Sequence, residues 1–187
     1  LSYVDRDFAA TAKKAIDHLV KLGHKKIAYI QNSRAKGKLN VGVDVRNAKE
    51  IKSYCKKVGI SVVEILSHND AESGRNALIS LRKEHPEVTG VIGLNDLATI
   101  GFISAAKEIG LEIPKDLSII SINTPNNQVH MTWPSLTTIQ LPAHQMGRAA
   151  AELLMHLVRG EENPNSQQLF VGDLEVRGTT AKPPTKR

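Results

Sequence analysis

The feature that most constrains this 187-residue chain is a regular alternation of amphipathic helical segments with short, apolar, strand-like segments. Helical segments repeat their apolar positions every three to four residues, and strand-like runs rich in branched residues lie between them. The predicted helices cover 8–22, 44–58, 70–84, 96–109 and 142–158, and the predicted strands cover 25–30, 60–66, 88–94, 117–122, 137–141 and 169–176. This order predicts an α/β fold, a doubly wound parallel sheet with helices on both faces.

Local signals predict where several of these helices begin and end. Asp7 stands directly before the first helix and Gly23 directly after it, as expected for an N-cap and for a left-handed residue that ends a helix. Asp44 is expected to cap the second helix, and Asp70 or Ser67 to cap the third. These residues place the helix ends that the alternation alone leaves open.

Composition argues against several classes of protein. Aromatic residues make up only 4% of the chain, which disfavours a surface that stacks nucleic-acid bases. The formal net charge is +6, but the lysines fall mostly on the polar faces of predicted helices, which favours solvated faces over a nucleic-acid patch. No apolar run approaches the ~20 residues that span a bilayer. We therefore expect a globular protein that does not enter a membrane.

The chain carries no pattern typical of an enzyme or of a bound cofactor. A dinucleotide-binding glycine fingerprint, a phosphate-binding loop and a serine nucleophile elbow are all missing. The seven histidines show no metal-ligand spacing, and His24, just after a helix, is expected to have a structural role. Cys55 is the single cysteine, and its place in mid-helix favours a buried side chain over a nucleophile. We predict no catalytic residue, no metal and no cofactor.

Polar residues follow three of the predicted strands at the point where each strand ends. Because the carboxyl ends of parallel strands meet at one edge of a sheet, these residues should converge there. Each pair is also what an ordinary helix cap or turn requires, so that alternative stays open. Amides and carboxylates supply both donors and acceptors, which suits a polyhydroxylated small molecule better than a phosphate. The three pairs are Asn69 with Asp70, Asn95 with Asp96, and Asn123 with Thr124.

A resemblance to a known family rests on four segments in order: HLVKLGHKKIAYI, NDLATIGFISAAKEIGLEIPKDLSIISIN, PSLTTIQLP followed by MGRAAAELLMHLV, and LEVRGTT. Together they resemble the effector-binding region of LacI/GalR-family transcriptional regulators, which is built like periplasmic sugar-binding proteins. The resemblance implies mostly the C-terminal subdomain of that region, without the DNA-binding headpiece. It implies an effector-binding and dimerisation region over 1–180, divided into a C-terminal subdomain (1–138), a crossover strand and helix toward the N-terminal subdomain (139–160) and a return strand (161–180), followed by a tail (181–187).

The resemblance also implies an effector site. Asn95 and Asp96 match the family's asparagine–aspartate pair, and Asn123 stands where the family usually has an aspartate. The arginine that the family places at the start of the second helix falls at Asn47, with Arg46 adjacent. Amides at these positions suit sugar hydroxyls, so a sugar or sugar derivative is the expected effector. The implied effector-binding residues are Asn123, Asn95, Asp96, Asn69, Arg46 and Asn47.

The same resemblance implies a partner surface and a function. Regulators of this family form homodimers, and Val129, Met131, Trp133 and Arg75 are expected to face the partner. The alternative for the three apolar residues is that they cap the chain's own core. The implied function is that of a cytoplasmic sensor in a bacterial repressor, in which a small effector modulates operator binding by a headpiece outside this chain. A solute-binding protein of a sugar ABC transporter and a small α/β enzyme remain rival interpretations.

Overall fold

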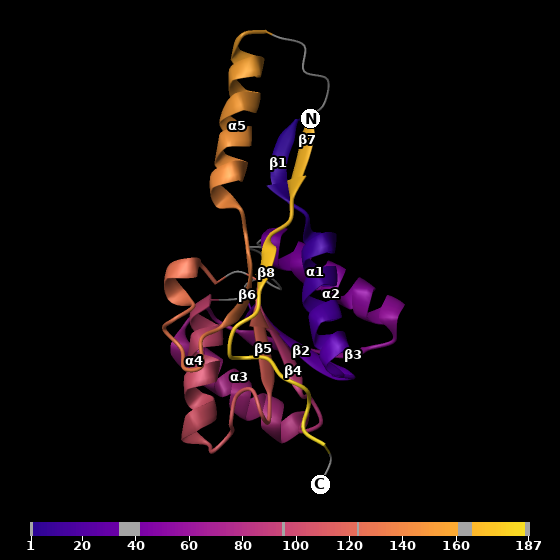
Figure 1. Cartoon of the computed structure of the whole chain (residues 1–187), viewed down its shortest axis with the longest axis vertical. Helices are drawn as coiled ribbons and strands as arrows, with labels where there is room; N and C mark the ends of the chain where they lie inside the picture. Colours follow the sequence, from indigo (N-terminus) through magenta and orange to yellow (C-terminus); the bar gives the residue numbers. More distant parts are fainter. Residues whose placement is uncertain (1, 34–41, 95, 123, 161–165, 186–187) are drawn as a thin grey trace.

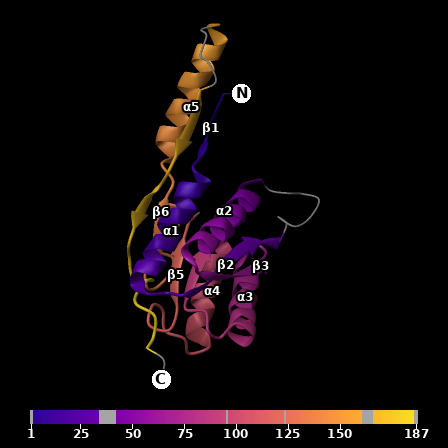
Figure 2. The same cartoon turned by 90° about the vertical axis from the view of Figure 1, so that its right-hand side faces the viewer.

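Figure 1 shows the computed structural model of the chain, which describes residues 2–33, 42–94, 96–122, 124–160 and 166–185. An arm projects from an α/β body, and the view turned by 90° shows the same projection (Figure 2). The arm consists of helix α5 (Ala143–Val158) and two parallel strands, β1 (Tyr3–Arg6) and β7 (Gln167–Phe170). Residues from both ends of the chain therefore build the arm.

The body contains a six-stranded sheet in the order β3-β2-β4-β5-β6-β8. Five of its strands run parallel, and β8 pairs antiparallel with β6. The strand order reverses between β2 and β4, because the chain moves from β2 outward to β3 and then back to β4. This arrangement confirms the predicted doubly wound α/β fold. The strands are β2 (Lys26–Asn32), β3 (Ser61–Ser67), β4 (Gly90–Gly93), β5 (Ser118–Ser121), β6 (Thr137–Gln140) and β8 (Asp173–Glu175).

Helices cover both faces of this sheet. On one face α1 and α2 pack against strand residues that include Tyr29 and Ile92, and on the other face Leu78 of α3 and Phe102 of α4 are fully buried against the sheet. None of the described helices combines the length and the apolar character that a membrane crossing needs. The helices of the body are α1 (Phe8–Leu22), α2 (Gly42–Val58), α3 (Ala71–Glu84) and α4 (Asp96–Glu108).

Side-chain caps set the starts of two helices as predicted. The Asp7 carboxylate accepts a hydrogen bond of 2.8 Å from the backbone N–H three residues later, and Asp70 accepts an equivalent bond of 2.7 Å. Gly23 ends α1 with a φ of 105°, also as predicted. The predicted cap at Asp44 is wrong: α2 begins two residues earlier, and Asp44 lies buried inside its first turn.

The predicted last strand, 169–176, is two strands in two different sheets. Strand β7 pairs with β1 in the arm, whereas β8 pairs with β6 in the body. Between them, Gly172 passes so close to β6 that a Cβ atom there would lie 2.1 Å from the backbone oxygen of Gln140. The chain therefore changes sheet at a position that leaves no room for a side chain.

The first residue of the predicted tail is anchored to the body. The backbone oxygen of Ala181 lies 3.0 Å from Nε2 of His24 and accepts a hydrogen bond of 3.0 Å from the Ser118 hydroxyl. Nδ1 of His24 lies 2.9 Å from the hydroxyl of Thr89, so both ring nitrogens have partners. Burial lowers the pKa of His24, which favours the neutral ring. The structural role predicted for His24 is confirmed by these two hydrogen-bond partners of its ring.

Candidate functional site

The carboxyl ends of the parallel strands meet at the edge of the sheet that faces the arm. Arg6, at the end of β1, reaches this edge and donates a hydrogen bond of 3.4 Å to the backbone oxygen of Ile122, just beyond β5. In open α/β sheets, ligands bind at this edge beside the point where the strand order reverses. Here that point lies between β2 and β4. A pocket of about 390 Å³ opens nearby, and its lining residues are Asn32, His68, Asn69 and Asp70.

Two of the predicted site residues converge at this edge. The Asn69 side-chain amide donates a hydrogen bond of 2.8 Å to the carboxylate of Asp96, 27 positions away in the sequence. The backbone N–H of Leu97 donates to Asn69 Oδ1 at 3.1 Å and to Asp96 Oδ1 at 2.9 Å. The pair thus caps α4, and Asn69 also lines the pocket, so for Asn69 the two interpretations left open by the sequence are compatible. Asn95 and Asn123 lie outside the described residues.

Two buried amides at the same edge lack hydrogen-bond partners within the described part of the chain. Asn47, in the second turn of α2, is 1% exposed, and neither of its side-chain polar atoms has a partner. Gln31, near the end of β2, is 3% exposed, and its Oε1 has none either. Burial also raises the pKa of the Asp44 carboxyl, one turn before Asn47. This part of the body therefore buries polar groups that the described chain does not satisfy.

The sequence predicted a site role for Asn47 but not for Gln31. The signal that could have found Gln31 is the strand period: Ile27, Tyr29 and Gln31 alternate along β2 and face the same side. Ile27 and Tyr29 pack in the core cluster that contains Ile51 of α2. Gln31 continues this row of buried side chains at the carboxyl end of β2. A polar side chain buried there needs a hydrogen-bond partner, either a ligand or another group of the protein.

Arg46 lies at this edge as well, but its charge is already engaged. Its guanidinium pairs with the Asp5 carboxylate, and it lies 4.3 Å from the centre of the Phe8 ring. Arg6 lies over the same ring at 5.7 Å, and burial lowers the pKa of Arg6. These groups line a pocket of about 610 Å³ between the arm and the start of α2, together with Lys49. No sequence pattern indicated this aromatic ring between two arginines.

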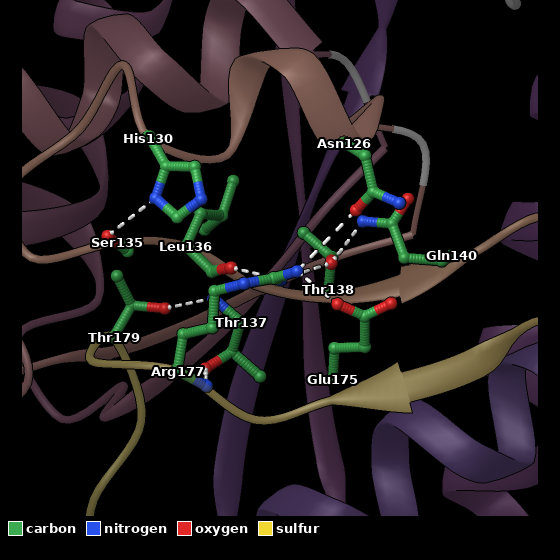
Figure 3. A network of polar contacts seen from close by, with 10 residues as sticks. All are labelled: Asn126, His130, Ser135, Leu136, Thr137, Thr138, Gln140, Glu175, Arg177 and Thr179. Atoms are coloured by element: carbon green, nitrogen blue, oxygen red, sulfur yellow. Dashed lines mark hydrogen bonds and ion pairs between the residues drawn. The ribbon is translucent and has the colours of Figure 1, made fainter.

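A further pocket of about 350 Å³ lies where the chain passes from the body to the arm. Two amides, Asn126 and Gln140, line it beside the apolar side chains of Ile122 and Ile139. Figure 3 shows these amides within a network of polar contacts centred on Arg177. Neither amide was predicted as a site residue: Asn126 begins a short 3-10 helix that no sequence signal indicated, and Gln140 is the last residue of β6.

The structure also brings Ser33 and His68 together, which the sequence did not predict. The hydroxyl of Ser33 lies 2.9 Å from Nδ1 of His68. A nucleophile and its base usually need a third group that orients the base. In the described ranges, no hydrogen bond to the other ring nitrogen of His68 provides one. Those same ranges hold no cluster of three or more histidine, cysteine, aspartate and glutamate side chains that would bind a metal ion.

The predicted partner residues have different surroundings. Val129 is 1% exposed and packs in the core with α3 and α4, so its side chain is not available to a partner, and the prediction for it is wrong. Trp133 is 91% exposed and Met131 65% exposed, three to five residues before Leu136, which re-enters the core. Arg75 is also exposed, and its Nε donates a hydrogen bond of 2.9 Å to Glu108 of α4.

Comparison with known proteins gives a consistent family. Residues 16–180 match the model of a family described as a periplasmic binding protein-like domain. The HTH-type transcriptional regulator MalR of Streptomyces coelicolor is 30% identical over 191 residues, which cover 99% of this chain and 54% of that protein. The chain thus spans about half the length of the curated relatives it matches.

Solved structures agree with this assignment. A LacI family transcriptional regulator from Bifidobacterium animalis subsp. lactis matches with a TM-score of 0.85 and 25% identity, over 97% of this chain and 69% of that one. A LacI family regulator from Enterococcus faecium, solved with bound ribose, matches with a TM-score of 0.79 and 26% identity, over 97% of this chain and 65% of that one. The chain therefore belongs to the periplasmic binding protein-like family, in the form that LacI-family transcriptional regulators carry as their effector-binding domain.

Proposed function

We propose that this chain senses a small polyhydroxylated ligand, a sugar or sugar derivative, at the carboxyl edge of its six-stranded sheet. The observation that carries the proposal is the pair of buried amides, Asn47 and Gln31, whose polar atoms lack partners within the described residues. A buried amide without a hydrogen bond costs about 1–3 kcal/mol. A ligand whose hydroxyls donate to and accept from these amides would recover that free energy on binding.

Other groups at this edge favour a neutral hydroxylated ligand over an ion. The charge of Arg46 is compensated by Asp5, and that of Asp96 is partly satisfied by the Asn69 amide. The pocket beside Asn69 is lined by two amides and an imidazole, which can both donate and accept, and by the Asp70 carboxylate, which accepts. The ribose in the related Enterococcus faecium regulator supports a sugar as the ligand class.

In the whole regulator, we infer that ligand binding shifts the population of sensor conformations and thereby the placement of DNA-binding headpieces outside this chain. We further propose that the whole regulator is a cytoplasmic, homodimeric repressor and that this chain is its sensor. The names of its relatives, which are transcriptional regulators and repressors, support this function over a transporter's solute-binding protein or an enzyme.

Calorimetric titration of the 187-residue chain with D-ribose, D-glucose, maltose and lactose tests the ligand proposal. We expect at least one sugar to bind, and the Asn47→Ala variant to bind it at least tenfold more weakly. Because Asn47 has no hydrogen-bond partner among the described residues, this variant should fold normally. Asn76→Ala, an exposed amide on α3, is the matched control and should bind like the unaltered chain. Absence of binding by every sugar, or equal binding by Asn47→Ala, contradicts the proposal.

The proposed partner surface comprises Met131, Trp133 and Arg75. Sedimentation velocity of the Trp133→Asp variant tests it, because a charge at the centre of an apolar contact destabilises association. Val58→Asp is the control, since Val58 is also exposed but lies at the end of α2, on the opposite face of the sheet. We expect the first variant to be monomeric at concentrations at which the second is dimeric. An unchanged dimer in the Trp133→Asp variant refutes this surface.

A further inference from the structure

Arg177 connects parts of the chain that are far apart in sequence. It follows β8, and its side chain is only 17% exposed. Nη1 donates to the backbone oxygen of Leu136 at 2.9 Å and to the Thr138 hydroxyl at 2.8 Å. Nη2 donates to Asn126 Oδ1 at 3.5 Å and also pairs with the Glu175 carboxylate (Figure 3). One guanidinium thus contacts Asn126, Leu136 ten residues later, and Thr138 in strand β6.

These contacts hold both ends of segment 126–136. Asn126 begins this segment and Leu136 ends it, and Arg177 hydrogen-bonds to both. Within the segment, the N–H of Leu136 donates to the backbone oxygen of Val129 at 3.0 Å. The exposed side chains of Met131 and Trp133 lie between these fixed points. The Arg177 guanidinium therefore holds both Asn126 and the exposed turn that carries Met131 and Trp133.

The same contacts decide which polar atoms remain for the 350 Å³ pocket. A guanidinium can only donate hydrogen bonds, so Asn126 must present its Oδ1 to Arg177, and its Nδ2 is then a donor that no described residue accepts from. The side-chain amide of Gln140 donates to the Thr138 hydroxyl, which also accepts from Arg177, and this leaves Gln140 Oε1 as an acceptor. Since both amides line the pocket, together they present one donor and one acceptor of fixed orientation to it, beside the Arg6 and Thr124 side chains that line it as well.

We propose that Arg177 is a positioning residue for ligand recognition in the pocket between body and arm. It orients the Asn126 donor and, through Thr138, the Gln140 acceptor, a combination that suits two adjacent hydroxyls of one ligand. Through Leu136 it also joins this pocket to the exposed turn that carries Trp133. The inference about hydroxyls rests on the proposed function, whereas the fixing of segment 126–136 is independent of any ligand.

An arginine is required for these contacts because they diverge. Its planar fork reaches Leu136 and Thr138 with one nitrogen and Asn126 with the other, whereas a lysine offers a single compact ammonium. Arg177→Lys keeps the charge beside Glu175 but should release Asn126. Thr179→Val is the matched control. Thr179 lies two residues after Arg177, donates a buried hydrogen bond to Ile119 and accepts one from Thr137. Within the described residues, its hydroxyl is hydrogen-bonded to neither Asn126 nor Leu136.

The first measurement is amide hydrogen exchange by NMR in the 187-residue chain without ligand. In Arg177→Lys, we expect exchange at Met131 and Leu136 to rise at least tenfold relative to amides of β4, because the segment loses its fixed ends. In Thr179→Val, exchange in segment 126–136 and in β4 should change by the same factor. If Arg177→Lys also changes both regions equally, Arg177 has only a general structural role and the proposal is wrong.

The second measurement compares the affinities of D-ribose and 2-deoxy-D-ribose, which differ by one hydroxyl. The unaltered chain and Thr179→Val should prefer ribose by at least tenfold, and Arg177→Lys should lose most of this preference. A preference that survives in Arg177→Lys contradicts the role in recognition. If ribose fails to bind the unaltered chain, ribose is the wrong ligand, and the exchange rates alone then decide whether Arg177 positions the segment.

Discussion

Replacing Gly101 with alanine is expected to force α3 and α4 apart. Each of these helices places a glycine against the backbone of the other: a Cβ atom at Gly101 would lie 2.2 Å from the backbone oxygen of Ala71, and one at Gly74 would lie 2.0 Å from that of Ala98. Real Cβ atoms essentially never approach closer than 3.0 Å, and a backbone oxygen cannot rotate away. The whole interface must therefore open to admit one methyl group.

Two opposing contributions set the change in the free energy of unfolding in Gly101→Ala. Alanine is favoured over glycine inside a helix by about 1 kcal/mol. Forcing an additional methyl group into a packed interface costs about 1–3 kcal/mol, and a radial gap of about 0.5–1 Å forfeits a quarter to a half of each affected van der Waals contact. At Gly101 the packing loss dominates, because the obstructing atom belongs to the backbone. A packing cost at the upper end of this range, about 3 kcal/mol, less the propensity gain of about 1 kcal/mol, leaves an expected loss of about 2 kcal/mol in the free energy of unfolding.

Gly147→Ala is the matched control, because Gly147 lies inside α5 and a Cβ atom there would have no neighbour within 4 Å. It should stabilise the chain by up to about 1 kcal/mol through helix propensity alone. In urea denaturation followed by circular dichroism, the midpoint of Gly101→Ala should fall by about 1 M, while that of Gly147→Ala should rise. Equal stabilisation by both variants would refute the close approach of α3 and α4.

Three further changes test the core and the buried ionisable groups. Phe102→Ala should lower the free energy of unfolding by about 3–5 kcal/mol in urea denaturation, because Phe102 is fully buried. Asp44→Asn should raise stability at pH 7, since burial raises the pKa of this carboxyl and its charged form is disfavoured in the folded state. Because burial lowers the pKa of His24, the unfolded chain binds its proton first, so stability should fall as pH drops below about 6.5. Melting at pH 7.5 and 5.5 measures this loss, which His24→Gln should reduce.

Much of the fold was predictable because helix and strand periods are properties of neighbouring residues. The spacing of apolar residues located the five α-helices of the described residues, and Asp7, Gly23 and Asp70 marked ends that the structure confirms. The failures occurred where a local pattern has two possible meanings. Asp44 has the chemistry of a cap but lies inside a helix, and the apolar run 169–176 reads as one strand although it crosses between two sheets.

The candidate site was predictable only in part. The rule that polar residues converge at the carboxyl edge of a parallel sheet correctly brought Asn69 and Asp96 together. It carried no information on burial. The hydrogen-bonded pair and Asn47, which has no side-chain partner among the described residues, therefore looked alike in the sequence. Val129 and Trp133 looked equally apolar within one short segment, yet one lies in the core and the other is almost fully exposed.

The sequence by itself determined the α/β class and the order of the helices and of most strands, because these follow from residue spacing along the chain. It also predicted that the polar residues after the parallel strands gather at one edge of the sheet. Only the tertiary structure decided which groups at that edge are buried, which are hydrogen-bonded and which remote segments meet. Arg177 meets Asn126 across 51 positions, and no periodic pattern encodes such a pair. The physical reason is that hydrogen bonding and burial depend on distances between remote segments, which packing alone fixes.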